Sequence, residues 1–171
     1  PAGAAYTRES LLEEILSRQL EDGGFALSGS TMDPDVTGIA LQALAPYAHD
    51  DTPVGESGTS ARQAVKAALA ALPQQQDEDG GYSTMGTATC ESAAQVVVAL
   101  CSLGIDPIAD PRFIKNGRSP VDALLDYRQA DGGFAHLSGG KSDYKASAQA
   151  LYALVAVQRL QNGQRRLFDL R

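Results

Sequence analysis

A Gly-Gly-aromatic motif preceded by an acidic residue occurs three times in this 171-residue chain. It reads QLEDGGF at residues 19–25, QDEDGGY at 76–82 and QADGGF at 129–134. Paired glycines disfavour a helix, yet the residues on both sides of each motif have helical hydrophobic periodicity. The first glycines lie at positions 23, 80 and 132, a spacing typical of a repeated supersecondary unit. The motif therefore predicts three helical hairpins, each with a first and a second helix.

Each residue of the motif has a predicted role at the corner of its hairpin. The first glycine takes the left-handed conformation that ends the preceding helix, since it has no Cβ. The second lets the chain reverse closely against that helix, and the aromatic residue packs on the apolar seam to set the return angle. The predicted corner residues are Gly23, Gly24, Phe25, Gly80, Gly81, Tyr82, Gly132, Gly133 and Phe134.

The stretch before each motif is predicted to form the first helix of a hairpin, because its apolar residues recur at helical spacing. Each of these stretches begins with a serine and a longer polar residue at the spacing of a capping box. The pairs are Ser10 with Glu13, Ser60 with Gln63, and Ser119 with Asp122. Pro73 has no amide hydrogen, so we expect the middle first helix to kink or stop early there.

The second helices are predicted over residues 33–47, 89–103 and 143–160, with Asp33, Thr89 and Asp143 as N-caps in one register. They are apolar on more than one face and should be the more buried helix of each pair. The sequence thus predicts an all-α fold with six main helices in a single domain over residues 1–171. Its repeats span about 8–48, 58–104 and 118–160, and residues 161–171 form a tail leading into a following segment.

The charge and hydrophobicity of the chain limit the kinds of molecule that it is expected to bind. The net charge of −7 argues against binding to nucleic acid or to an anionic membrane surface. No apolar run reaches membrane-spanning length, and no signal peptide is visible. The start at PAGAAY, without an initiator Met, indicates a mature chain or an excised fragment. Cys90 and Cys101 fall on one predicted helix about 16 Å apart, too far for a disulfide, and are expected to be buried.

A Gln, an acidic residue, paired glycines and an aromatic residue at the end of a first helix resemble the repeat of the terpenoid cyclase and protein prenyltransferase α/α toroid. That repeat usually carries Trp, which this chain lacks. The stretches DPDVTGIALQALAPY, SAAQVVVALCSLGIDP with DPRFIKNG, and QALYALVAVQR look more closely like prenyltransferase-type repeat domains of large bacterial cell-surface proteins. Those domains are similar in fold to the helical domain of cobalamin carriers.

The resemblance implies a partial α/α toroid, because complete rings in these families use five to seven hairpins and this chain has three. Such a half-ring is open unless further repeats, another domain of the parent chain or a second copy completes it. The resemblance also implies an extracellular or cell-surface location.

The catalytic motifs of the same fold families are matched poorly. Asp33 and Asp35 lack the paired aspartates of squalene-type cyclases, and Ala146 falls where prenyltransferases carry a zinc-binding His. A zinc site from Asp35, Cys90 and His136 is conceivable but less favoured than a buried thiol and a surface imidazole. Gln95 follows Cys90 by five residues, the wrong spacing for the thioester of complement-like domains. The sequence therefore favours a non-catalytic protein, with no catalytic residue, metal or cofactor predicted.

Polar residues near the starts of the second helices are the candidate ligand-binding groove rim. They are Asp35, Glu91, Gln95, Asp143, Tyr144, Lys145 and Gln149. The alternative is that Asp35 and Glu91 only favour the helix dipole. Lys145 is expected to pair with Glu91 or Asp143, and the amides of Gln95 and Gln149, in one register, need hydrogen-bond partners.

Three functional hypotheses remain. The first is a non-catalytic binding or structural module of a larger bacterial surface protein, presenting a concave helical groove. The second is a terpenoid-cyclase or prenyltransferase-like enzyme, or a cobalamin-type small-molecule carrier. The third is an assembly module that closes its half-ring by dimerisation. The expected partners are other domains of the parent chain, a second copy or a small molecule, without nucleic acid or membrane insertion.

Overall fold

The computed structural model describes residues 6–169, and within them six α-helices dominate. The first helices of the three hairpins are α1 (Arg8–Ser17), α3 (Ala61–Ala71) and α5 (Pro120–Leu125). The second helices are α2 (Pro34–Leu44), α4 (Cys90–Ser102) and α6 (Tyr144–Gln161). The predicted all-α class with six main helices is thus confirmed.

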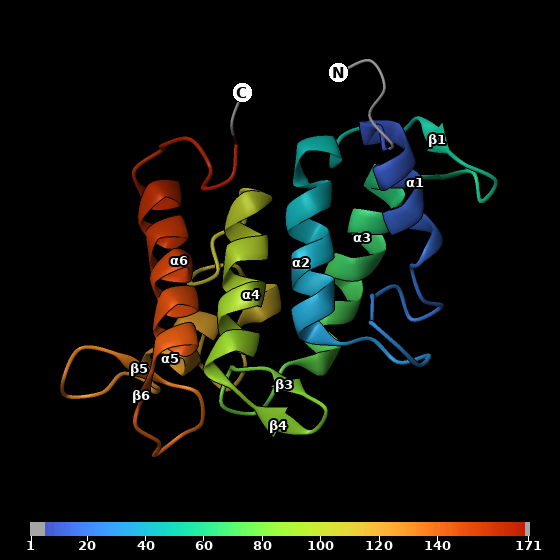
Figure 1. Ribbon diagram of the computed structural model, residues 1–171. Coiled ribbons are helices and arrows are strands. Elements are labelled where there is room, and N and C mark those ends of the chain that lie inside the picture. The colour runs from blue at the N-terminus through green and yellow to red at the C-terminus, as the bar shows by residue number, and fades with distance from the viewer. Residues whose placement is uncertain (1–5, 170–171) are drawn as a thin grey trace.

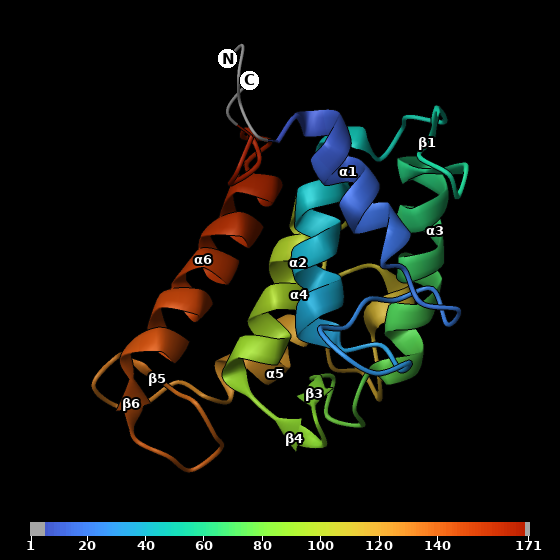
Figure 2. The same ribbon diagram turned by 45° about the vertical axis from the view of Figure 1, so that its right-hand side comes forward.

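The second helices α2, α4 and α6 lie side by side in chain order (Figure 1). The first helices lie along one side of this row, where α3 contacts both α1 and α2, and α5 contacts α4 (Figure 2). In Figure 1, α1 and α3 run downward and α2, α4 and α6 run upward, so the chain enters each second helix at the lower end of the molecule.

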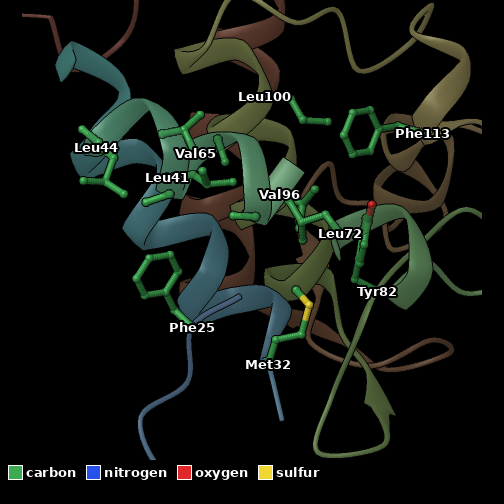
Figure 3. Packing of buried hydrophobic residues seen from close by; sticks show 14 of the residues in the cluster. Phe25, Met32, Leu41, Leu44, Val65, Leu72, Tyr82, Val96, Leu100 and Phe113 are labelled. Carbon is green, nitrogen blue, oxygen red and sulfur yellow. The ribbon is translucent and has the colours of Figure 1, made fainter. Parts of the chain in front are cut away.

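The buried apolar residues form two clusters that meet at α4. Val96, Ala99 and Leu100 of α4 pack in the first cluster, with residues of α1, α2 and α3 (Figure 3). Cys90, Ala94, Val97 and Cys101 face the second cluster, with α5 and α6. Nearly all of α4 is therefore buried, and both cysteines are buried free thiols, as predicted.

Most predicted caps are confirmed, and one is wrong. Asp33, Thr89 and Asp143 cap the second helices, and Ser60 and Ser119 form capping boxes at α3 and α5. At α1, however, the N-cap is Thr7, whose hydroxyl accepts the Ser10 amide at 3.1 Å. Ser10 is the third residue of this helix and completes Thr7's capping box, so its expected box with Glu13 does not form.

The second and third of the first helices are less regular than α1. α3 ends at Ala71, before Pro73, and continues as the 3₁₀ helix η2 (Leu72–Gln75), so the predicted early stop is confirmed. α5 has only six residues and follows an irregular segment that contains η3 (Pro111–Phe113). The 3₁₀ helix η1 (Ala45–Tyr47) extends α2.

Three small antiparallel strand pairs were not predicted. They are β1 (Pro53–Val54) with β2 (Thr59–Ser60), β3 (Ser83–Thr84) with β4 (Thr87–Ala88), and β5 (Phe134–Ala135) with β6 (Ser142–Asp143). The last two pairs join a corner to its second helix. Each strand has two residues, too few to show the alternating pattern by which strands are recognised in sequence.

The corners have the predicted backbone but do not end the helices. Gly23, Gly80 and Gly132 have φ of 89°, 88° and 89°, in the left-handed region. However, α1, α3 and α5 end several residues earlier, so the predicted helix-terminating role is wrong. The motif instead forms a separate closed turn, in which the Leu20 amide bonds the Gly24 carbonyl at 2.9 Å and Gly23 returns a bond to Leu20 at 2.9 Å.

The same bonds recur in the other two corners, through Asp77 in the second and Gln129 in the third. The aspartate of each motif adds a bond from the second glycine: the Oδ1 atoms of Asp22, Asp79 and Asp131 accept it at 2.9, 2.8 and 3.0 Å. The acidic residue is thus part of the corner, which explains its presence in every repeat.

Candidate functional site

A chain of glutamine side chains crosses the row of second helices. Gln42 of α2 donates to the Gln95 side-chain oxygen at 2.9 Å and to its carbonyl at 3.3 Å. Gln95 in turn donates to the Gln149 side-chain oxygen of α6 at 2.8 Å. Gln95 and Gln149, which were predicted to need hydrogen-bond partners, therefore bond to each other. Gln42 was not predicted because the repeat places Ile39, not Gln42, at the position of Gln95 and Gln149. Gln42 lies about one helical turn after Ile39.

The glutamine chain borders a cavity of about 240 Å³. Tyr152 of α6 and Phe168 of the tail supply aromatic surface to its lining. The tail reaches this position because it turns back after α6, where the Gln164 amide bonds the Arg159 carbonyl at 2.8 Å. Amides and rings in one cavity can bind a small molecule with both polar and flat apolar surfaces.

Glu91 is paired with His136, a residue that was not predicted as its partner. It is buried in the first turn of α4, and its Oε2 lies 2.9 Å from Nδ1 of His136. The His136 carbonyl also accepts the Cys90 amide at 3.1 Å, which fastens the β5–β6 hairpin to the start of α4. The expected pairing of Lys145 is wrong: Lys145 is exposed and has no ion pair within residues 6–169, and the carboxylate of Asp143 caps α6.

Asp35 lies in the first turn of α2 with one carboxylate oxygen unpartnered. Its Oδ1 is shielded from solvent and has no hydrogen bond within the described part of the chain. Burial raises the pKa of this carboxyl group, while the hydroxyls of Ser92 and Thr84 oppose that shift, and the charges of Asp33 and Glu91 add to it. Asp35 and Glu91 thus lie in the first turns of α2 and α4, where the charge of Glu91 acts on the Asp35 carboxyl group.

Asp143, Tyr144 and Lys145 are the rim residues at the start of α6, and all three are exposed. Tyr144 is 90% exposed, and none of the three lines the glutamine cavity. The predicted rim is thus divided: Gln95 and Gln149 line the cavity, whereas Asp35 and Glu91 lie at the helix starts.

Cys90 and His136, two residues of the conceivable zinc site, have side chains bonded to different neighbours. Burial, followed by the charges of Glu91 and Asp143, raises the pKa of Cys90 to about 12, so its thiol is protonated and a poor nucleophile at neutral pH. His136 is engaged with Glu91 rather than with Cys90. Among residues 6–169, no three His, Cys, Asp or Glu side chains are grouped so as to hold a metal ion.

The corners also join successive repeats through a buried amide. Nε2 of Gln19 donates to the Gly23 carbonyl at 2.7 Å and to the Ala64 carbonyl of α3 at 2.8 Å. Nε2 of Gln76 likewise donates to the Gly80 carbonyl at 2.9 Å and to the Phe113 carbonyl, just before α5, at 2.8 Å. The first corner is thereby bonded to the second repeat, and the second corner to the segment that leads into the third repeat.

The third corner has no such neighbour in the described chain. A Cβ added to Gly23 would lie 2.9 Å from the Ala67 carbonyl oxygen, and one on Gly80 would lie 2.9 Å from that of Ser119. At Gly132 no atom lies within 4 Å of the added Cβ. Arg128, exposed, replaces the bridging glutamine at this corner.

The residues on the free side of α6 are equivalent, by position in the repeat, to the residues of α4 that α6 covers. On α4 the positions are Cys90, Ala94, Val97 and Cys101, all buried. The corresponding residues of α6, which we call the α6 stripe, are Tyr144, Ala148, Leu151 and Val155. Tyr144 is 90% exposed and Leu151 58% exposed. Exposed apolar patches mark interaction surfaces in many proteins, and the α6 stripe is therefore a candidate for one.

No protein-family model matches the chain, and no curated protein matches it either. The toroid-family resemblance therefore remains a prediction from the motifs. None of the helices within residues 6–169 combines the length and apolar character that crossing a bilayer requires.

Proposed function

We propose that the chain is a non-catalytic structural and binding module of a larger bacterial surface protein. In this proposal its three hairpins are consecutive units of an α/α toroid, a half-ring whose open edge docks a further helical hairpin. The observation that carries the proposal is the α6 stripe: at the positions that α4 buries, Tyr144 and Leu151 are exposed and Ala148 and Val155 are half-buried.

The third corner supports the same conclusion independently. In the first two corners the first glycine is close-packed against the next repeat, and a glutamine bonds to that repeat or to the segment leading into it. The third corner keeps the left-handed glycine and the closed turn but has open space beside it. The glycine and the turn of the first two corners are therefore present beside open space, while Arg128 stands in place of the bridging glutamine.

The opposite edge of the molecule offers a complementary surface. A groove of about 320 Å³ between α1 and α2 is almost entirely apolar, with Ile15, Val36 and Ile39 in its lining. Head-to-tail contact between two copies would place this edge against the α6 stripe and close the ring. A following domain of the parent chain can occupy the same stripe.

The α6 stripe is tested with Leu151→Asp, because Leu151 is exposed in the single chain and its replacement should leave the fold intact. We expect the wild-type mass, measured by sedimentation velocity, to rise with concentration and the variant to stay monomeric. Met85→Asp is the matched control: Met85 is 95% exposed in the β3–β4 turn, and Asp tolerates its left-handed backbone.

If the wild-type chain stays monomeric, the parent protein provides the decisive test. Leu151→Asp should then lower the unfolding temperature of the parent protein while leaving that of the single chain unchanged. A monomeric wild type together with no effect in the parent protein contradicts the proposal.

The glutamine cavity favours small-molecule binding as a second candidate function. Three amides and two aromatic residues line a space of about 240 Å³ on the row of second helices. Such a set is suited to a hydroxylated compound with a flat apolar face. Titration with monosaccharides should shift the side-chain NMR signals of Gln42, Gln95 and Gln149 together if the cavity binds them, and unchanged signals count against sugars.

A further inference from the structure

A cavity of about 460 Å³ lies beside α3, away from the glutamine chain and the α6 stripe. Its volume is within the range of about 300–1,000 Å³ that small-molecule sites occupy. Much of its lining is apolar, formed by Ala48, Val65, Leu69, Ala70, Leu103 and Ile105.

The cavity exists because the third repeat has a short first helix. α3 has eleven residues, whereas α5, the next first helix, has six. In place of the missing turns the chain runs irregularly from Leu103 to Ser119, and the cavity lies between this segment and α3. Apolar residues of α3 that a longer α5 would cover are left accessible.

The rim of the cavity is cationic although the chain as a whole carries a net charge of −7. His49, Arg62, Lys66 and Arg112 line it, and no acidic residue does so among those described. Arg62 is bound to Asp51 at 2.7 Å and Arg112 to Asp110 at 2.7 Å. Lys66 has no hydrogen bond or ion pair within residues 6–169, so its ammonium group is available to an anion.

We propose that this cavity binds an amphiphilic carboxylate with a linear alkyl chain. The alkyl chain lies on the apolar lining, between Leu69 and Ile105, and the carboxylate lies at Lys66. Arg62 stands one helical turn before Lys66 on the same face of α3, but its charge is paired with Asp51, so Lys66 is the group that meets the carboxylate.

Both parts of the ligand are needed by this arrangement. An uncharged alkyl chain would leave Lys66 without a partner, and a cationic amphiphile would place a like charge beside Lys66. Each CH₂ group buried raises affinity about fourfold, so binding should depend steeply on chain length.

The test is isothermal titration calorimetry of the wild-type chain with sodium decanoate below its micelle-forming concentration. We expect one decanoate per chain, with octanoate weaker by about tenfold or more. Decanol should bind more weakly than decanoate, and decyltrimethylammonium should not bind. Equal affinities for decanoate and decanol, or many decanoates per chain, would overturn the proposal.

Three variants locate the site. Lys66→Glu should weaken decanoate binding by about tenfold or more, because it places a like charge at the carboxylate. Lys141→Glu is the matched control, since it makes the same charge change at an exposed position elsewhere and should leave affinity unchanged. Ala70→Trp should abolish binding by filling the cavity, and Ala70 is exposed enough to accept the larger side chain without unfolding.

These variants also exclude other occupants. Binding that survives Ala70→Trp lies elsewhere on the chain and contradicts the assignment. Equal weakening by Lys66→Glu and Lys141→Glu indicates only a general charge effect, and it contradicts the assignment as well. Circular dichroism of each variant must match the wild type for its result to count.

Discussion

The aromatic residues of the corners show how single side chains hold this fold together. Phe25, Tyr82 and Phe134 are all buried, as the motif predicted. The backbone amides of Phe25 and Phe134 also bond to hydroxyls of the second helices, Thr37 at 2.9 Å and Ser147 at 2.8 Å. The side chain therefore packs the return of the chain while the backbone is tied to the helix that follows.

Tyr82 is the imperfect member of this set. It is 1% exposed, and its hydroxyl has no hydrogen-bond partner among the described residues; burial, with a smaller contribution from Asp77, raises its pKa. We predict that Tyr82→Phe raises the free energy of unfolding by about 1–2 kcal/mol, because it removes an unsatisfied buried polar group. Urea denaturation measures the change, and Phe25→Tyr, the reverse exchange in the first corner, should destabilise. A loss of stability in Tyr82→Phe would mean that the hydroxyl is satisfied.

Asp35 gives a pH-dependent prediction. Burial raises its pKa in the folded protein, so the folded state holds the proton more tightly than the unfolded chain does. The free energy of unfolding that this group contributes therefore falls as pH rises through the folded pKa. Asp35→Asn has no proton to lose, and its stability relative to wild type should increase with pH and then level off. Urea denaturation of both proteins over a pH series tests this, and a difference independent of pH contradicts it.

At the level of helices and turns, the bridging glutamines are what join one repeat to the next. Gln76 is buried and holds both its own corner and the segment before α5. Backbone carbonyls of two separate elements thus depend on one amide. The equivalent third position holds Arg128, exposed and without a following repeat in the described chain.

We predict that Gln76→Ala lowers the free energy of unfolding by about 2–3 kcal/mol, since it leaves two buried carbonyls without their donor. Arg128→Ala is the matched control and should change stability by less than about 0.5 kcal/mol. Chemical denaturation compares the two. Equal effects would show that the corner does not depend on the bridge.

The whole molecule is organised around α4, which is covered on both sides. It contributes to both apolar clusters and lies between α2 and α6. α6, although longer, is covered on one side only and presents the α6 stripe on the other. This asymmetry is the structural reason to expect a partner at α6.

We predict that backbone amides of α4 exchange with deuterium more slowly than those of α6 in the monomer. Local opening of α6 breaks fewer buried contacts than opening of α4, so it costs less free energy. Hydrogen-exchange mass spectrometry measures both helices in one experiment. Equal protection would indicate that α6 is covered by self-association, and Leu151→Asp should then speed exchange in α6 alone. Equal protection that persists in Leu151→Asp contradicts the prediction.

Much of the architecture could be predicted because its signals are local. Asp33, Thr89 and Asp143 cap helices through amides a few residues away. The left-handed glycines at 23, 80 and 132 need only their own lack of a Cβ. The Thr7 cap was missed because Ser10 carries a signal of similar strength three residues later, and local patterns do not separate the two.

The sequence alone determined the six helices and the three corners, because these depend on short spacings. Of the candidate site, it determined that Gln95 and Gln149 lie at equivalent positions along their helices. The tertiary structure decided which distant groups meet: Gln42 with Gln95, His136 in place of Lys145 beside Glu91, and the cavity left by the short α5. Such contacts depend on how helices from different repeats are offset along their axes and on the positions of the side-chain polar atoms. No residue pattern within one repeat contains that information, because packing between repeats sets it.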